Sequence, residues 1–146
     1  FYLPEEPMSA KKLTARQLIA KRRKSLRNKC DKLLREYCYA RDKNTCQKCR
    51  KQYLTAHDCQ MSHVYGRARD GRLKYDPRNV KVLCFRCHLY WWHENILEAS
   101  AWFNEAFPER AQYLKREHKA NMQLGTITTE WYEDRAAMLA ALISEL

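Results

Sequence analysis

Two Cys-x-x-Cys pairs constrain this chain more than any other feature of its sequence. They are Cys46 with Cys49 and Cys84 with Cys87, and 34 residues separate the two pairs. A two-residue gap lets both sulfurs of a pair turn toward one ion, and four thiolates form the tetrahedral shell that Zn²⁺ prefers. One such pair alone is weak evidence because redox-active pairs have the same spacing. Two pairs in one basic chain predict a structural zinc site, and the loop between them has room for a functional insert.

The number of cysteines also indicates the compartment. The chain has seven, which in a basic chain is typical of metal ligands and buried thiols rather than of a disulfide framework. The sequence has no signal peptide and no apolar run near the roughly 18 residues that a membrane span needs. We therefore expect a protein of the reducing cytoplasm with no membrane partner. The 146 residues suffice for one compact unit with its own core.

The formal net charge of +11 is unevenly distributed along the chain. Residues 11–51 hold 16 Lys and Arg against three acids, whereas acids are in excess over residues 94–146. One basic end and one acidic end favour an oriented polyanionic partner, most simply nucleic acid. The alternative is a solvated basic helix without such a partner. The basic residues that we expect to contact DNA are Lys21, Arg22, Arg23, Lys24, Arg27, Arg69 and Arg72.

Residues 14–42 have the pattern of one long amphipathic helix. Thr14 and Gln17 have the spacing of a capping box, in which each side chain bonds to the backbone N–H of the other residue. Apolar residues recur at helical spacing along a narrow stripe, and most of the remaining surface is Lys and Arg. Cys30 and Cys38 lie near this stripe, so we interpret both as packed thiols rather than as metal ligands.

The rest of the chain predicts short strands followed by helices, which makes the fold class α+β. Residues 54–65 and 79–85 have the composition of strands, with turn signals at residues 70–71 and 76–77 between them. We expect helices over residues 87–107, from Pro108 onward, and from a cap at Thr128 or Thr129 to the end. Apolar residues form one face of the last helix, as core or as the contact of a homodimer: Met138, Leu139, Leu142 and Ile143.

The order of the motifs resembles a known enzyme family. A Cys-x-x-Cys pair, His63, Asn79 and a second pair followed at once by His88 are similar to HNH endonucleases of the ββα-metal fold. The chain is similar in particular to the phage and prophage branch in which two zinc knuckles bracket the nuclease hairpin, as in the NinG-like recombination proteins. The resemblance covers residues 46–95, a third of the chain. It implies a zinc-bound nuclease core there, a basic helical extension over residues 1–45 and a helical extension over residues 96–146.

The resemblance also assigns roles to single residues. In the family the first histidine, here His63, is the general base that takes a proton from water, a task that suits imidazole. Asn79 matches the family's asparagine, which pins the loop that orients the base. Arg67 matches an arginine that contacts the phosphate. His88 matches the ligand of the catalytic ion, Mg²⁺ or Mn²⁺. His93 follows five residues later, about 500° around a regular helix, so it should face away from His88 unless the helix is irregular. A core histidine, a turn asparagine and a surface charge are the ordinary alternatives.

The chain departs from the family pattern directly before His63. Many family members have Asp or His there as a first metal ligand, whereas this chain has Ser62, and a hydroxyl is a poor ligand for a hard cation. On a regular strand His57 and Cys59 lie on the same side as His63. Either residue could therefore supply the metal ligand that is missing at Ser62. The identity of the first metal ligand is therefore open.

Together these features predict a metal-dependent DNA endonuclease. Structural Zn²⁺ would hold the core, and a separate Mg²⁺ or Mn²⁺ would act on the phosphodiester, by nicking or by double-strand cleavage. One alternative is a non-catalytic zinc-stabilised protein that binds DNA or a junction. Another is an interaction protein whose acidic C-terminal helices recruit a partner. The cellular setting that the resemblance implies is the cytoplasm of a bacterium or of a phage-infected cell.

Overall fold

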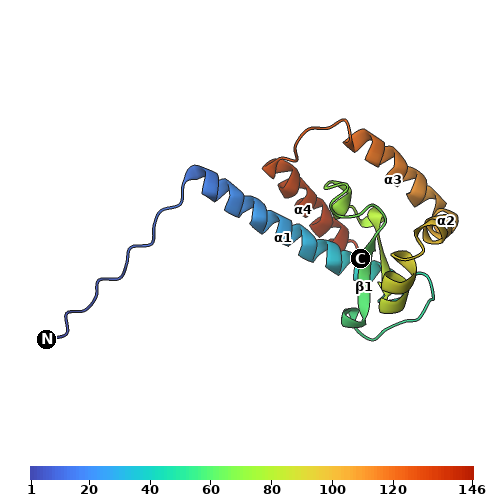
Figure 1. The fold of residues 1–146 in the computed structure, drawn as a ribbon, viewed down its shortest axis with the longest axis horizontal. Helices are drawn as coiled ribbons and strands as arrows, with labels where there is room; N and C mark the ends of the chain where they lie inside the picture. Colours follow the sequence, from blue (N-terminus) through green and yellow to red (C-terminus); the bar gives the residue numbers. More distant parts are fainter.

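The computed structural model describes residues 1–146 and has a mixed α+β architecture (Figure 1). Four α-helices surround one short β-hairpin, and a six-residue π-helix follows the second strand. The elements in chain order are α1 (Ala15–Asp42), β1 (Cys59–His63), β2 (Val80–Cys84), the π-helix (Cys87–Trp92), α2 (Ile96–Ala106), α3 (Pro108–Asn121) and α4 (Thr129–Ser144). No helix is both long and apolar enough to cross a membrane.

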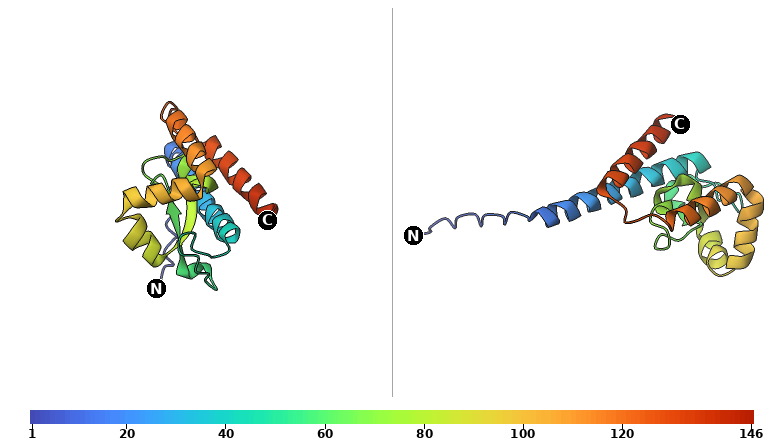
Figure 2. Two further views of the ribbon diagram at one scale, coloured as in Figure 1. Left: turned by 90° about the vertical axis from the view of Figure 1, so that its right-hand side faces the viewer. Right: turned by 90° about the horizontal axis from the view of Figure 1, so that it is seen from above.

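The long helix α1 begins and ends at local signals. Thr14 Oγ1 accepts from the N–H of Gln17 at 3.2 Å, and the Gln17 side chain accepts from the Thr14 N–H at 2.9 Å, so the predicted capping box is confirmed. The helix ends at Lys43, whose left-handed backbone (φ 54°) stops the helical pattern. The N-terminal half of α1 projects beyond the rest of the molecule, and residues 1–14 have no regular secondary structure (Figures 1 and 2).

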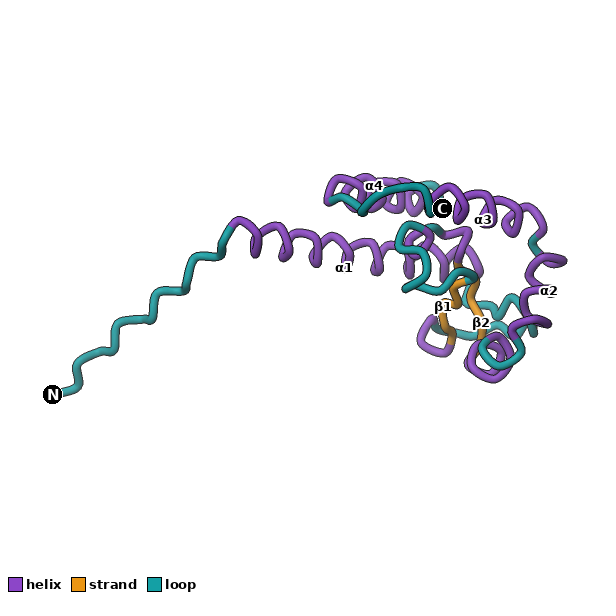
Figure 3. The backbone as a smooth tube through the Cα atoms, turned by 45° about the horizontal axis from the view of Figure 1, so that its top comes forward, coloured by secondary structure: helices purple, strands orange, loops and turns teal.

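The larger hydrophobic core lies between α1 and α4, which pack side by side (Figure 3). Cys30 and Cys38 are fully buried in it, so their interpretation as packed thiols is confirmed. Burial raises the pKa of the Cys38 thiol to about 11. Thr128 caps α4 by accepting from the N–H of Trp131, and Leu139 is completely buried against α1. The apolar face of α4 therefore contributes to the core of this chain.

The two strands pair antiparallel, with His63 opposite Val80 and Cys59 opposite Cys84. The first strand is shorter than the sequence pattern predicts because residues 56–58 form a 3₁₀ turn instead. The strand alternation that placed His57 beside His63 therefore does not apply, and that prediction is wrong. The His57 side chain is 95% exposed and lies 3.9 Å from the Asp58 carboxylate.

The single helix predicted over residues 87–107 is two elements. The π-helix ends at Trp92, a turn over residues 93–95 interrupts the chain, and α2 begins at Ile96. A second core joins the π-helix to α2 and α3 through Trp92, Phe103 and Leu114, all of which are buried. Because the turn over residues 93–95 separates the two elements, Trp92 at the end of the π-helix and Phe103 on α2 both face this core.

Candidate functional site: a cysteine cluster beside a basic, histidine-lined hollow

The two Cys-x-x-Cys pairs come together in space. The sulfurs of Cys46, Cys49, Cys84 and Cys87 all lie within 4.8 Å of one another. Cys49 Sγ and Cys84 Sγ are 3.9 Å apart, close to the edge of about 3.8 Å that a tetrahedron with zinc–sulfur bonds of about 2.3 Å requires. Four thiols on two separate turns thus form a group that can hold a metal ion such as zinc.

Backbone geometry sets the position of each pair. Around the first pair, the N–H of Cys46 donates to Lys51 O, and the N–H of Arg50 donates to Cys46 O. Arg50 adopts a positive φ of 66° to close this turn. In the second pair the N–H of Cys87 points at Cys84 Sγ, 3.5 Å away. Burial alone would raise the pKa of Cys84, but this N–H and the neighbouring sulfurs lower it to about 7, which favours the thiolate that binds metal.

The cluster also fixes the elements that carry the histidines. Cys84 is the last residue of β2 and Cys87 the first of the π-helix, so an ion there would join the hairpin to the turn that bears His88. Beside it lies a hollow of about 240 Å³, lined by Arg35, Tyr39, Cys59, Gln60, Met61, His63, Arg67 and His88. Three predicted site residues, His63, Arg67 and His88, therefore share one cavity.

His63 is held in one orientation by the loop that follows it. Its Nε2 lies 3.0 Å from the backbone carbonyl of Lys74. Because a carbonyl can only accept, Nε2 carries the proton and Nδ1 keeps the lone pair. Burial, together with the nearby basic side chains of Arg67, Lys81 and Lys74, lowers the pKa of His63 to about 4. The imidazole is therefore neutral at pH 7 and has a free acceptor nitrogen.

Asn79 holds the loop between the strands. Its Oδ1 accepts from the N–H of Tyr65 at 2.8 Å, and its Nδ2 donates to the carbonyls of Tyr65 and Leu73, both at 3.0 Å. The residue is completely buried. Since Leu73 directly precedes Lys74, the asparagine fixes the segment whose carbonyl orients His63. Asn79 thus pins this loop, and its part in catalysis stays a prediction.

The irregular helix brings two histidines together. The N–H of His93 donates to His88 O five residues earlier, which is the π-helical pattern. Their Nε2 atoms are 3.0 Å apart, whereas on a regular α-helix the side chains would face apart. His88 Nδ1 lies 2.5 Å from Gln60 Oε1, so Nδ1 carries the proton and Nε2 is unprotonated. Burial and the adjacent His93 lower the pKa of His88 to about 4.

The distance of 3.0 Å is that of a hydrogen bond between the two imidazoles, and it would also suit two nitrogens bound to one metal ion. Metal–nitrogen bonds of about 2.1 Å at right angles would place the two nitrogens about 3.0 Å apart. Metal-bound histidines commonly donate their other N–H to a fixed acceptor, as His88 does to Gln60. Gln60 is the residue whose role the sequence pattern did not single out, because an isolated glutamine on a strand carries no signal of its own.

Ser62 lies on the other side of the strand from His63 and is completely buried. Its Oγ accepts from Lys81 Nζ at 3.0 Å. Lys81 is itself completely buried, and its Nζ lies 3.1 Å from the centre of the Trp92 ring. Ser62 therefore takes part in a buried polar pair instead of facing the hollow. The sequence pattern did not identify this pair, since a lysine within an apolar strand is usually at an exposed position.

The predicted DNA-contacting residues divide into two groups. Lys21, Lys24, Arg27 and Arg69 are exposed. The other three make contacts within the chain: Arg22 pairs with Glu133 at 3.3 Å, Arg23 donates to Ile127 O, and Arg72 donates to Gly125 O at 3.0 Å.

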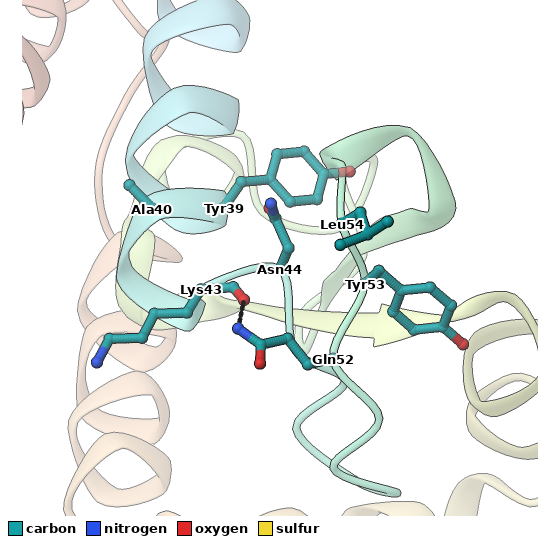
Figure 4. Close-up of a pocket in the computed structure, with 7 residues that line it drawn as sticks. All are labelled: Tyr39, Ala40, Lys43, Asn44, Gln52, Tyr53 and Leu54. Carbon is teal, nitrogen blue, oxygen red and sulfur yellow. Dashed lines mark hydrogen bonds between the residues drawn. The ribbon is translucent and has the colours of Figure 1, made fainter.

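A larger hollow lies on the other side of Tyr39, between the end of α1 and residues 52–54 (Figure 4). In it the Gln52 side chain donates to the carbonyl of Lys43 at 3.4 Å. Its lining has no histidine, cysteine or carboxylate, so it lacks the side chains that usually bind a metal ion, and its titratable side chains are those of Lys43, Tyr39 and Tyr53. The smaller, histidine-lined hollow is the better candidate site.

The chain matches no known family model, no curated protein and no solved structure.

Proposed function

We propose that the protein is a metal-dependent endonuclease of the HNH type, which hydrolyses phosphodiester bonds of DNA. The observation that carries the proposal is the convergence of His63, Arg67 and His88 on one hollow beside a four-cysteine cluster. The order of hairpin, second cysteine pair and helical turn agrees with the ββα-metal arrangement of that family. The cysteine cluster would hold a structural Zn²⁺, which would fix the position of the π-helix relative to the hairpin.

In this mechanism His63 is the general base. Its Nδ1 would take the proton from water as the oxygen attacks phosphorus, and its Nε2–H would remain bonded to the Lys74 carbonyl. The low pKa of His63 keeps it neutral at physiological pH, although it makes the imidazole a weaker base. Arg67 would bind a non-bridging phosphate oxygen through its planar guanidinium. Asn79 would act through the loop, as a positioning residue.

His88 and His93 would hold the catalytic divalent ion through their Nε2 atoms. The ion would stabilise the charge that develops on the phosphate and on the leaving oxygen. Two imidazoles are softer donors than the carboxylates that Mg²⁺ usually takes. We therefore expect Mn²⁺, Ni²⁺ or Zn²⁺ to support cleavage better than Mg²⁺ does.

The proposal is tested with supercoiled plasmid DNA and a series of divalent metals. The parent protein should produce nicked or linear DNA, and His63→Ala should lose at least about 100-fold in rate, as expected on loss of a general base. His57→Ala is the matched control, because His57 is exposed and does not line the hollow. Equal cleavage by the parent and by His63→Ala would contradict the role of His63.

A non-catalytic zinc-stabilised DNA-binding or junction-binding protein is the second candidate. It is favoured by Ser62, which is buried against Lys81 and leaves the position before His63 without a metal ligand. A chain with tightly bound zinc that binds DNA but cleaves none with any metal would support this candidate over the nuclease.

A further inference from the structure

One exposed face of α1 carries a row of cations. At 100° per residue, Lys21, Lys24, Lys32 and Arg35 fall within about 80° of the helix circumference. All four are exposed. The buried Leu26 lies on the opposite side of the helix, where α4 packs. We call the face formed by these four cations the α1 track.

The cations of the α1 track are free to bind a ligand. None of its three lysines makes an ion pair or a side-chain hydrogen bond within the chain. The neighbouring arginines differ, because Arg22 and Arg23 point toward α4 and its preceding loop. Asp31, an acid beside the track, lies 3.6 Å from the ammonium of Lys74. The net potential along the track is therefore positive.

The track leads into the candidate site. Arg35 at its C-terminal end lines the same hollow as His63 and His88, with Arg67 contributed by the loop after β1. Tyr39, one turn further along α1, also lines this hollow and donates to Cys59 O at 3.0 Å, which joins the helix to the first strand. A polyanion on the track would therefore continue into the hollow without a gap in positive charge.

The shape of the track fits a duplex better than a single strand. From Lys21 to Arg35 the helix rises about 21 Å, at about 1.5 Å per residue, which matches about six base pairs at about 3.4 Å each. The N-terminal half of α1 projects from the body, so a straight rod can lie along it (Figure 2). Proteins that hold single strands use exposed aromatic side chains for stacking, whereas the one other residue of this face between Lys21 and Arg35 is Asn28.

We propose that the α1 track binds the phosphate backbone of duplex DNA over about six base pairs on one side of the phosphate that enters the hollow. This inference rests on the proposed nuclease function, since it specifies which substrate the same site accepts. The substrate would be DNA with a continuous duplex arm on that side. On the other side of the scissile phosphate the protein would need no arm of comparable length.

Binding is measured first, without cleavage, by fluorescence anisotropy of a duplex of about 30 base pairs in the His63→Ala background. Lys24→Gln/Lys32→Gln should weaken binding about tenfold near 0.1 M salt and reduce the slope of log affinity against log salt by about 1.8. The matched control, Arg16→Gln/Lys29→Gln, removes the same charge from exposed positions on other faces of α1. Equal loss in both variants, or equal loss for a single strand of the same length, would overturn the proposal.

Cleavage is measured next on duplexes shortened one base pair at a time from either end. KM should rise when one arm falls below about six base pairs and should tolerate shortening of the other arm. A symmetric requirement, or equal cleavage of an RNA duplex, would overturn the proposed substrate. If no metal supports cleavage, the nuclease function fails, whereas the binding comparison still decides whether the track holds duplex DNA.

Discussion

At the scale of single residues, the orientation of the candidate base His63 is set by a series of hydrogen bonds in the loop that follows it. Asn79 donates to Leu73 O, and the next carbonyl, that of Lys74, accepts from His63. The histidine could be identified from the order of motifs in the sequence. The carbonyl that accepts the hydrogen bond from His63 could not be identified in this way. A backbone carbonyl has no residue-specific signature, and its position depends on how the loop folds.

Replacement of Asn79 should therefore impair catalysis more than DNA binding. We expect Asn79→Ala to lower kcat about 10- to 100-fold, the usual effect of removing a group that orients a catalytic residue, with KM nearly unchanged. Steady-state kinetics check the separation of kcat from KM, and circular dichroism measures the folded fraction. A loss of activity no larger than the loss of folded protein would indicate that Asn79 has a structural role alone.

Lys81 is completely buried, whereas a lysine side chain is usually charged and exposed. Burial, assisted by the nearby Arg110, holds its pKa well below the usual range of a lysine. Between this lowered folded pKa and the unfolded pKa of about 10.4, the unfolded chain binds more protons than the folded chain does, so stability rises with pH across that interval.

Replacement of the buried pair should stabilise the fold. We expect Ser62→Ala/Lys81→Met to raise the free energy of unfolding by about 1–4 kcal/mol at pH 7, as when buried ionic groups are replaced by apolar ones of similar volume. Denaturant unfolding at several pH values measures this gain, which should shrink toward pH 10 as the unfolded lysine loses its proton. A gain that does not depend on pH would mean that packing, not desolvation of Lys81, is its origin.

At the scale of elements, the sequence determines the α-helices better than the segment between the strands. Periodicity and caps predicted α1, α3 and α4 because both are local properties of the chain. The π-helix was missed because it depends on the anchoring of Cys84 and Cys87 and on the packing of Trp92. The π-helix also changes His93 from a residue expected to face away into a neighbour of His88.

Asp70 is a buried carboxylate that ties the loop between the strands to α3. Asp70, with a side chain 4% exposed, accepts from the N–H of Leu73 at 2.9 Å and from the Nδ2 of Asn121 at 3.1 Å, and its Oδ2 lies 2.9 Å from His118 Nδ1. Burial alone would raise its pKa, but these donors together lower it below the usual 3.8.

Loss of this carboxylate should destabilise the fold in a pH-dependent manner. Because the pKa of Asp70 is lower in the folded chain, its contribution is complete above about pH 4 and disappears as pH falls through the folded pKa. We expect Asp70→Asn to cost about 1–3 kcal/mol at pH 6, and less below pH 4. Urea unfolding between pH 3 and pH 6 measures the difference; a constant cost across this range would exclude the charge of Asp70 as the cause.

At the scale of the whole molecule, the two larger hydrophobic cores of the chain have different supports. The α1–α4 core is held by apolar packing and contains none of the clustered cysteines, whereas the second core includes Cys46 and Cys84. The sequence predicted both the four-cysteine site and the long helices. It could not predict that α1 and α4 pack on each other, because that contact joins segments about 100 residues apart with no local signal.

Removal of a metal ion from the cysteine cluster should therefore affect the two halves of the molecule, each built around one of these cores, unequally. We expect a chelator, or Cys84→Ser, to release the hairpin and the π-helix, since a structural zinc site contributes directly to the folding energy of the segments it joins. Hydrogen exchange should rise by more than tenfold over residues 80–92, while the buried middle of α1 against α4 stays protected. Cys38→Ser is the matched control, because it alters a buried cysteine outside the cluster. Equal deprotection of both halves would show that the cores fold as one unit, and no change at all would show that the cluster holds no structural metal.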